Sequence, residues 1–454
     1  MKRKLTAVEN IREYILNLLE DERIKAGNRL PSAREIALKK RVSFIKVQQA
    51  IDSLRSDGIL ETVPRQGTFV KASWNSQYLR NSIFISGFDN KNLFGLGKII
   101  REELCELRIN RSNIRGDFEI DVTLNMQSNH KEYMDLSGIF DELYPDKSIF
   151  YMKPFEYFRR ENKLYAIPLI FSPRVICYNL DMLKNAGCEA PEKNWRWDDF
   201  ISVVRKLKTK YKTENIYSYY PFMAPNMIMA YVFRAGGGFL NDEGRVLINS
   251  DKSRKGLLLY KSLLNELEYK SYTVSGYFNE GTLAFGFSPR QEFMPRADEL
   301  KFNWGSVPLP RIEGGNKTTV QTTEGLCVRK SCTDLKLVRK VVKAMLGDRI
   351  QSCFARSRYG IPVRRDIAEK SMEGNEDARD RLFFDEIPNM SAAYSVESPE
   401  ILYWLRKGLN NLLHKDDTEF DKALDELYIF FKNYIEIDKY GKENSKGSEK
   451  KDIL

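Results

Sequence analysis

Two hydrophobic periods follow each other along the first seventy residues. Apolar side chains at helical spacing run from Ile11 to Leu18 and again from Val47 to Leu54, and Ile36 marks a shorter helix between them. The segment 59–70, ILETVPRQGTFV, instead predicts two short strands around a turn at Pro64–Gly67. Three helices followed by a hairpin are the layout of a winged helix-turn-helix domain.

Polar residues at the expected helix boundaries support this interpretation. Thr6-x-x-Glu9 and Ser32-x-x-Glu35 have the spacing of capping boxes, in which each side chain accepts a hydrogen bond from the other residue's backbone N–H. Ser43 is the expected N-cap of the third helix. The sequence therefore predicts where each of the three helices begins.

Beyond residue 76 the pattern changes to strands that alternate with amphipathic helices. The runs 81–88 and 117–126 indicate buried strands, and the runs 94–107 and 197–208 indicate helices with one apolar face. Strands that alternate with helices are typical of an α/β sheet. We therefore predict a multidomain chain, with an α+β winged-helix unit in front and a larger α/β unit behind it.

Charge divides the chain in the same way. Residues 1–75 hold 15 Lys/Arg and 9 Asp/Glu, so they carry 15 − 9 = +6 of the +10 on all 454 residues. A basic small domain at one end favours nucleic acid as a partner. We expect a DNA-binding domain at 1–75, an effector domain at 76–437, and a charged, disordered tail at 438–454.

Several classes of protein are disfavoured by the composition. No apolar run approaches the roughly 20 residues that span a bilayer, so no membrane partner is expected. The basic start lacks the apolar segment of a signal peptide, which predicts a cytoplasmic location. The six cysteines and two histidines lack metal-ligand spacing, so we expect idle thiols, no metal and no cofactor. No GxSxG, Walker A or HExxH motif is present, and no enzymatic activity is expected.

The order of motifs between residues 7 and 72 makes the first domain more specific. The strings P-S-x-R-E-I-A, V-S, A-I-x-x-L-x-x-x-G-I-L and Q-G-T-F-V together resemble the winged-helix domain of the GntR family of bacterial transcription regulators. The resemblance implies that the third helix enters the major groove of DNA. It also implies that Arg34 contacts phosphate or a base, and that Gly67 lets the wing backbone approach the DNA.

The expected DNA-binding residues follow from this resemblance and from the helical periodicity: Arg34, Ser43, Phe44, Ile45, Lys46, Gln48, Gln49, Arg65, Gln66 and Gly67. Phe44 and Gln48 stand where the family usually has arginine, and Arg65 replaces a glycine. Because glutamine pairs with adenine and apolar groups contact the thymine methyl, we predict an operator half-site richer in A·T than the family norm. Packing of Phe44 under the wing is the alternative. Arg34, Lys46 and Arg65 are expected to contact the phosphate backbone, which positions the protein without specifying sequence.

Six segments between about residues 80 and 437 resemble the family 1 extracellular solute-binding proteins of sugar ABC importers. They occur in the order that the family has them: YAIPLIFSPRVICYNLDMLKNAG, WRWDDFISVVRKL, FRAGGGFLNDEGRVLINS, FNEGTLAFGFSP, VPLPRIEGG and RYGIPVRRD. The resemblance implies two α/β lobes of the type II periplasmic-binding-protein fold. The lobes are joined by crossing strands, and they close on a ligand that lies in the cleft.

The candidate ligand-binding residues are Arg174, Tyr219, Tyr220, Phe222, Gly237, Arg290, Trp304 and Glu324. The aromatic residues could stack on sugar rings, although buried aromatics more often belong to the core. The tetrapeptide FSPR occurs at 171–174 and at 287–290. Either this is a coincidence, or Arg174 and Arg290 face one cleft and bind an anionic sugar, since guanidinium groups suit carboxylates and phosphates. Glu324 could accept hydrogen bonds from sugar hydroxyls.

These observations predict a bacterial DNA-binding regulator that senses a small molecule, either a sugar or an anionic sugar. Family resemblance implies a homodimer on a palindromic double-stranded operator. The solute-binding component of a carbohydrate ABC importer is the alternative function. An aminotransferase-like enzyme fused to a winged helix is a third class, but the chain shows no motif for a Schiff-base lysine and its phosphate site.

Overall fold

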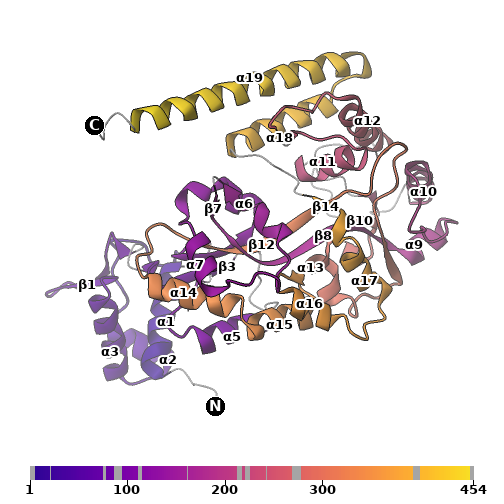
Figure 1. Ribbon diagram of the computed structural model, residues 1–454. Helices are drawn as coiled ribbons and strands as arrows, with labels where there is room; N and C mark the ends of the chain where they lie inside the picture. The colour runs from indigo at the N-terminus through magenta and orange to yellow at the C-terminus, as the bar shows by residue number, and fades with distance from the viewer. Residues whose placement is uncertain are drawn as a thin grey trace.

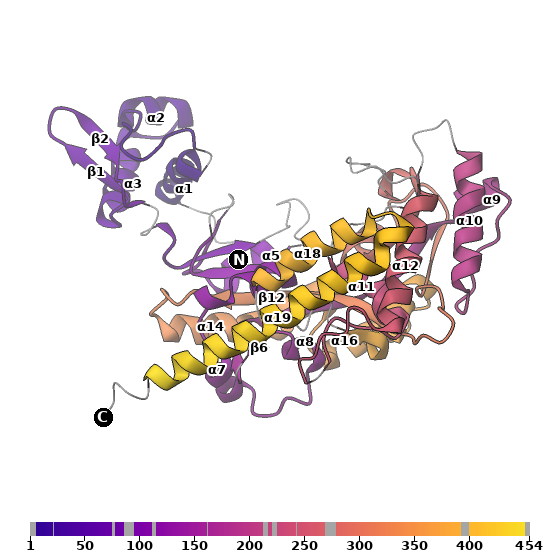
Figure 2. The same ribbon diagram turned by 90° about the horizontal axis from the view of Figure 1, so that it is seen from above.

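The computed structural model describes residues 6–449 except 21, 75–77, 86–94, 111–114, 161, 212–216, 220–224, 242, 268–277 and 392–398. Figure 1 shows a small N-terminal domain at one end of the molecule, beside the first lobe of a larger α/β unit. The second lobe, with α9 (Leu180–Asn185) and α10 (Trp197–Lys210), lies at the other end in both Figure 1 and Figure 2. The predicted multidomain organisation is confirmed.

The N-terminal domain has the predicted three helices and hairpin. Its elements are α1 (Ala7–Glu20), α2 (Ala33–Lys40), α3 (Phe44–Ser56), β1 (Leu60–Val63) and β2 (Gly67–Val70). The two strands pair antiparallel around a three-residue turn. Apolar residues at the helical spacing noted in the sequence form one buried cluster between these elements.

Both predicted capping boxes are present. The backbone N–H of Thr6 donates to Glu9 Oε2 (2.7 Å), and that of Glu9 donates to Thr6 Oγ1 (3.2 Å). Ser32 N donates to Glu35 Oε2 (2.7 Å), and Glu35 N donates to Ser32 Oγ (3.3 Å). Ser43 is the N-cap of α3, as predicted, but its hydroxyl makes no capping hydrogen bond. That hydroxyl therefore remains available on the surface at the start of α3.

The first lobe is built on the parallel strands β3 (Ser82–Ile85), β4 (Arg108–Ile109) and β5 (Phe118–Val122). Its helices are α5 (Leu96–Glu103), α6 (Thr123–Ser128), α7 (Ser137–Leu143), α8 (Lys153–Glu156), α14 (Leu335–Met345), α15 (Asp348–Ser357) and α16 (Arg365–Ser371). Two small strands, β6 (Arg159–Arg160) and β7 (Lys163–Leu164), form a separate hairpin. The apolar faces of these elements share one buried core.

The second lobe contains β9 (Tyr217–Tyr219), β10 (Leu283–Pro289) and β11 (Trp304–Val307). Besides α9 and α10, its helices are α11 (Pro225–Arg234), α12 (Asp251–Glu266), α18 (Pro399–Leu413) and α19 (Asp417–Glu449). A second core cluster lies within this lobe. A further hydrophobic cluster contains residues of β8 and of four shorter elements. These elements are α13 (Arg290–Phe293), α17 (Ala378–Asp385), β13 (Ile361–Pro362) and β14 (Met390–Ser391).

Two long strands cross from one lobe to the other. These are β8 (Ile167–Asn179) and β12 (Thr319–Val328), and the strand order is β4-β3-β5-β12-β8-β10-β9. The first half of β8 pairs with β12, and its second half pairs with β10 and β11. Nearly every residue of β8 is buried, as expected for a strand covered on both faces. One sheet therefore connects the two lobes.

The N-terminal domain is joined tightly to the first lobe. Tyr78 belongs to the N-terminal core, so that core extends past the predicted boundary at residue 75. The Arg108 guanidinium of β4 lies 3.1 Å from the centre of the Tyr78 ring and donates a hydrogen bond to the Tyr78 carbonyl. Asn81 N donates to Asp117 Oδ2 (2.9 Å), and Asp117 N donates to the Leu79 carbonyl (3.1 Å). These contacts hold residues 78–81 against β4 and the start of β5.

The predicted disorder of the tail at 438–454 is wrong for residues 438–449. The helix α19 continues through Glu449, while 450–454 lie outside the described residues. The buried residues Phe420, Leu424, Phe431 and Ile435 start this helix against the second lobe. Once a helix is nucleated, each further residue adds a backbone hydrogen bond at small cost, so polarity alone did not predict where it ends.

None of the described helices is both long enough and apolar enough to cross a bilayer.

Gly256→Ala is expected to lower the free energy of unfolding by about 1–3 kcal/mol. A Cβ on Gly256 of α12 would lie 2.5 Å from Val232 Cα and 2.8 Å from the Tyr231 carbonyl oxygen of α11, so the helices would have to separate. Urea denaturation measures the change. Gly138→Ala in α7 is the matched control, because its Cβ would meet no atom within 4 Å. Equal destabilisation of both variants would contradict the packing argument.

Candidate functional site

The face of α3 that points away from the core carries the residues predicted to read DNA. Ile45, Lys46 and Gln49 are exposed. Phe44 is 48% exposed, so it does not pack under the wing, and that alternative is excluded. Gln48 is half-buried, and its Nε2 donates to Asp52 Oδ1 (3.2 Å). The apolar and amide groups expected to contact adenine and thymine are thus brought onto one exposed face.

The wing and α2 add basic groups beside this face. Arg34 on α2 and Arg65 and Gln66 in the turn between β1 and β2 are exposed. Arg65 has a φ of 64° and Gly67 a φ of 118°, so the turn uses left-handed backbone at both positions. A Cβ on Gly67 would lie 2.6 Å from Arg29 Nε. Gly67 therefore also makes room for Arg29, a basic residue beside the wing that the motif comparison did not single out.

A second candidate site lies where the crossing strands meet both lobes. Glu324 of β12 is only 5% exposed, and it accepts a hydrogen bond from the Tyr359 hydroxyl (3.0 Å). Thr322 and Glu324 are two positions apart in β12, so their side chains lie on the same face of the strand. On the same face, Arg174 of β8 donates from Nε to Thr322 Oγ1 (3.1 Å) and from Nη1 to the Phe287 carbonyl (3.1 Å). Both Glu324 and Arg174 were predicted from the sequence.

Sequence reasoning missed three residues of this site, namely Thr322, Tyr359 and Gln291, of which Gln291 is the most informative. It follows Arg290 in α13, and its amide is close enough to Glu324 to lower the pKa of that carboxyl. Yet within the described part of the chain, neither amide atom of Gln291 has a well-formed hydrogen bond, although both atoms are buried. Buried polar atoms without partners are rare and costly in folded proteins. An amide in this state beside a carboxyl is what a binding site for hydroxyl groups would contain.

Unpaired polar atoms also occur on the opposite face of β12. Both amide atoms of Gln321 and the hydroxyl of Thr323 are buried without a partner. Gln321 lies opposite Pro173 of β8, whose lack of an N–H already limits pairing at this point. Among the described residues, unpaired polar atoms thus lie on this face of β12 as well as on Gln291 of α13.

Burial, together with the smaller effect of the nearby charge of Asp121, raises the pKa of the Glu324 carboxyl to about 7 from its ordinary value of 4.5, against the opposing effects of the Tyr359 hydroxyl and the Gln291 amide. Because the folded-state value lies above the unfolded one, the unfolded chain releases this proton first as the pH rises. Glu324 therefore lowers stability progressively between about pH 4.5 and pH 7, by about 3 kcal/mol in all.

Glu324→Gln is expected to remove this loss of stability, because an amide can still accept the Tyr359 hydrogen bond but cannot ionise. Urea denaturation of both proteins at a series of pH values measures the effect. The difference in unfolding free energy should be small below pH 4.5 and should grow in favour of Glu324→Gln up to pH 7. A difference that stays constant with pH would contradict the raised pKa.

Arg290 does not take part in a paired-arginine site. Its guanidinium is 1% exposed and forms a bidentate ion pair with Asp380 of α17 (Nε–Oδ1 2.6 Å, Nη2–Oδ2 2.9 Å), and it also donates to the Gly360 carbonyl. The two FSPR segments are neighbours, because Arg174 lies opposite Pro289 in the β8–β10 pairing. However, Arg290 turns towards α17 while Arg174 turns towards Thr322. The prediction that both bind one anionic ligand is wrong.

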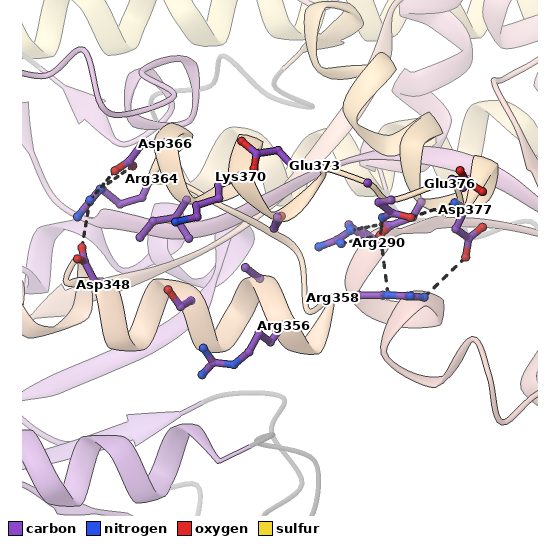
Figure 3. Close-up of a pocket in the computed structure, with 17 residues that line it drawn as sticks. Arg290, Asp348, Arg356, Arg358, Arg364, Asp366, Lys370, Glu373, Glu376 and Asp377 are labelled. Atoms are coloured by element: carbon purple, nitrogen blue, oxygen red, sulfur yellow. Dashed lines mark hydrogen bonds and ion pairs between the residues drawn. The ribbon is translucent and has the colours of Figure 1, made fainter.

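Arg290 and Asp380 instead form part of the wall of a cavity of about 930 Å³ between α15, α16 and α17. Figure 3 shows its charged side chains in opposite-sign groups, with Arg364 beside Asp348 and Asp366 at one end and Arg358 beside Asp377 at the other. Glu324 and Gln291 do not line it. Arg290, Arg358 and Arg364 each face a carboxylate, which weakens their attraction for an anion. Arg356 and Lys370 also line the cavity.

Two other predicted ligand residues have structural roles. Trp304 is buried in a hydrophobic cluster, with its ring edge-on to Phe278 and with the Arg379 guanidinium 4.4 Å from the ring centre. A Cβ on Gly237 would lie 2.5 Å from the backbone nitrogen of Ser253, so Gly237 permits close packing against α12. Trp304 is 8% exposed and presents no ring face to a sugar. Gly237 is half-buried, and its contribution to ligand binding stays a prediction.

The remaining predictions lie at the limit of the described structure. Tyr219 is the last residue of β9, where it lies opposite Phe285 of β10. Tyr220 and Phe222 lie outside the described residues. Their contribution to ligand binding stays a prediction.

Comparison with known proteins also assigns the two parts of the chain to different families. A model described as "Bacterial extracellular solute-binding protein" matches residues 122–352, and one described as "Bacterial regulatory proteins, gntR family" matches residues 7–70. The arabinooligosaccharide-binding protein of Bacillus subtilis is 22% identical over 202 residues, 42% of this chain and 46% of that protein. The probable fructoselysine utilization operon transcriptional repressor of Escherichia coli strain K12 is 28% identical over 155 residues, 32% of this chain and 61% of the repressor.

The chain spans about half the length of the curated relatives it matches. Among solved structures, an ABC substrate-binding protein from Listeria monocytogenes in complex with cycloalternan superposes with a TM-score of 0.66 at 16% identity, covering 78% of this chain and 98% of that one. This likeness shows the fold of the two-lobed domain. Both matching families are those that the sequence motifs resemble, and they are regulatory and solute-binding families.

Proposed function

Because the chain belongs to the bacterial extracellular solute-binding protein family and carries a GntR-family domain at its N-terminus, we propose that it is a cytoplasmic transcription regulator controlled by a small solute. The observation that carries this proposal is the tight seam between the two domains. Tyr78 of the winged-helix core is held by Arg108 of the first lobe. A movement of that lobe would therefore shift the DNA-binding domain.

One strand connects the solute site with this seam. At one end of β5, Asp121 is near enough to raise the pKa of Glu324. Just before the other end, Asp117 accepts the hydrogen bond from Asn81. A solute that changes how the lobes pack around Glu324 would therefore displace β5, whose preceding residue Asp117 is hydrogen-bonded to Asn81 of the segment that joins the two domains. Ligand and DNA affinities would then depend on each other through one coupling free energy.

The proposed effector is a neutral, hydroxyl-rich carbohydrate. The groups at the site are a carboxyl, an amide and hydroxyls, namely those of Glu324, Gln291, Tyr359 and Thr322, and they can both donate to and accept from sugar hydroxyls. The cation beside these groups is Arg174, and its guanidinium already donates to Thr322 Oγ1 and to the Phe287 carbonyl. A carboxylate without a dedicated cation partner disfavours an anionic ligand. This narrows the earlier expectation of a sugar or an anionic sugar.

A thermal-shift screen of neutral oligosaccharides, uronates and sugar phosphates tests the effector class. A ligand that binds only the folded state raises the melting temperature, and we expect this from a neutral sugar. Gln291→Ala should weaken that response at least about tenfold in ligand concentration, because a sugar hydroxyl loses the amide as its hydrogen-bond partner. Gln66→Ala, on the exposed wing, is the control and should respond like the unchanged protein. Selective stabilisation by anionic sugars would contradict the proposal.

The proposed operator is an A·T-rich palindrome of double-stranded DNA. Phe44 and Ile45 offer apolar contacts for the thymine methyl, and Gln48 and Gln49 offer amides for adenine. Selection of binding sequences from a random DNA library tests this directly. A·T pairs should dominate the positions contacted by α3, and a consensus dominated by G·C at those positions would refute the assignment.

A further inference from the structure

An aromatic stripe remains uncovered on the hairpin formed by α18 and α19. We define it as Tyr403, Trp404, Phe430, Tyr434 and Ile437. Ring contacts order its members: Tyr403 and Trp404 lie 5.1 Å apart between centroids, Trp404 and Phe430 5.7 Å, and Phe430 and Tyr434 5.9 Å. Trp404 is 39% exposed and Ile437 is 72% exposed. The stripe is therefore a preformed apolar surface rather than scattered side chains.

The helix α19 extends beyond the body that supports it. Figure 1 and Figure 2 both show α19 running past the end of α18. Ile435 is its last buried residue among those whose side chains are described, yet the helical backbone continues to Glu449. That extension of 14 residues is about 21 Å long at 1.5 Å per residue. Isolated helices of this length are marginal in water, which indicates that the extension has a partner.

We infer that the aromatic stripe and the projecting end of α19 form the homodimer interface, with the stripe of a second copy as the occupant. Phe430, Tyr434 and Ile437 recur at i, i+4 and i+7, the spacing with which one helix packs against another. An apolar stripe can pack against its own copy around a two-fold axis, because each side offers the same surface. The extra length of α19 would then lie along the partner's hairpin.

The area available is close to what a stable dimer requires. Aromatic side chains bury roughly 150–250 Å² each when fully covered, so the half-exposed stripe offers about 400 Å² per copy. The projecting helix, about 21 Å long and about 10 Å wide, adds roughly 200 Å². Two copies together would bury about 1,200 Å², which is the lower limit of standard specific interfaces.

The charges around the stripe favour a second copy over a membrane surface. Lys407 lies over the rings of Tyr403 and Trp404, at 4.9 and 5.5 Å from their centres. The exposed Glu426 and Glu436 lie on the same helix as the stripe. A face that binds anionic lipid carries lysine and arginine without acidic neighbours. Mixed charges around an apolar centre instead allow opposite signs to meet across a two-fold axis.

Sedimentation velocity of the full chain over a range of concentrations tests the inference. We expect a species with the mass of two 52.9 kDa chains. Ile437→Lys should weaken dimerisation by roughly tenfold or more, because it places a charge within the apolar contact. Phe430→Glu should do the same. Leu335→Lys is the matched control, since Leu335 is 47% exposed on α14 of the first lobe, and it should leave the dimer unchanged.

Each outcome decides the assignment. A chain that stays monomeric at all concentrations would overturn it, and so would a dimer that both stripe variants leave intact. Ile437 makes no core contact, so Ile437→Lys remains informative even if Phe430→Glu fails to fold, which circular dichroism would reveal. Because this measurement uses neither DNA nor a sugar, its failure would leave the proposed sensing function standing and would remove only the location of the interface.

Discussion

Arg290→Ala is expected to lower the free energy of unfolding by about 3–5 kcal/mol. Arg290 and Asp380 are each 1% exposed at the side chain, and their bidentate pair also satisfies the Gly360 carbonyl. Removing the arginine leaves a carboxylate and a carbonyl buried without their donor. Guanidinium denaturation of the two proteins measures the loss.

An exposed ion pair provides the matched control for that measurement. Arg339 of α14 contacts Glu142 at 3.0 Å, but both side chains are open to solvent. Arg339→Ala should therefore cost less than about 1 kcal/mol. The double variant Arg290→Met with Asp380→Leu should recover much of the stability, because it removes both charges together. If Arg290→Ala and Arg339→Ala were equally mild, the structural role assigned to Arg290 would be wrong.

Neutralising Arg34, Lys46 and Arg65 together is expected to reduce DNA affinity by about a hundredfold near physiological salt. All three side chains are exposed around the reading face of α3. Each is expected to contact one phosphate, and each lost contact should lower the slope of log affinity against log salt by about 1. Fluorescence anisotropy of a labelled duplex at several salt concentrations measures both quantities.

The same change of charge far from the winged helix is the control. Arg205, Lys206 and Arg245 are exposed on the second lobe. The first two belong to α10, which lies at the other end of the molecule from the winged helix (Figure 1). Replacing these three with alanine removes the same net charge without touching the proposed DNA face. Equal losses of affinity in the two triple variants would show that general electrostatic attraction, and not contact by the winged helix, holds the DNA.

Local signals in the sequence predicted the N-terminal domain well. Capping boxes, helical stripes and the turn at Pro64–Gly67 all depend on residues a few positions apart. Both partners of each such interaction can therefore be recognised in one short stretch of sequence. The alternation of strands and helices likewise predicted the two-lobed α/β domain. The end of α19 was mispredicted because a polar segment can continue a helix that packing has already started.

The ligand site was only partly predictable, because its contacts join distant parts of the chain. Arg290 was predicted to bind ligand, but its guanidinium pairs with Asp380, which lies 90 residues away in the sequence. Gln291, one position later, carries no motif, and only its buried unpaired amide distinguishes it. Tyr359 contacts Glu324 across 35 residues. No pattern of spacing encodes such pairings. Glu324 could be proposed from the sequence only because it stands where the solute-binding family often places cleft-lining residues.

The most direct test of sensing is a measurement of the coupling between solute and DNA. The affinity of the full chain for its selected operator should be measured with and without a saturating concentration of the sugar that stabilises it. The account predicts a change of at least about fivefold, and an equal change in sugar affinity when operator is present, because coupling is reciprocal. Arg108→Ala should reduce that change by loosening the seam at Tyr78. Operator affinity that is identical with and without the sugar would contradict the account.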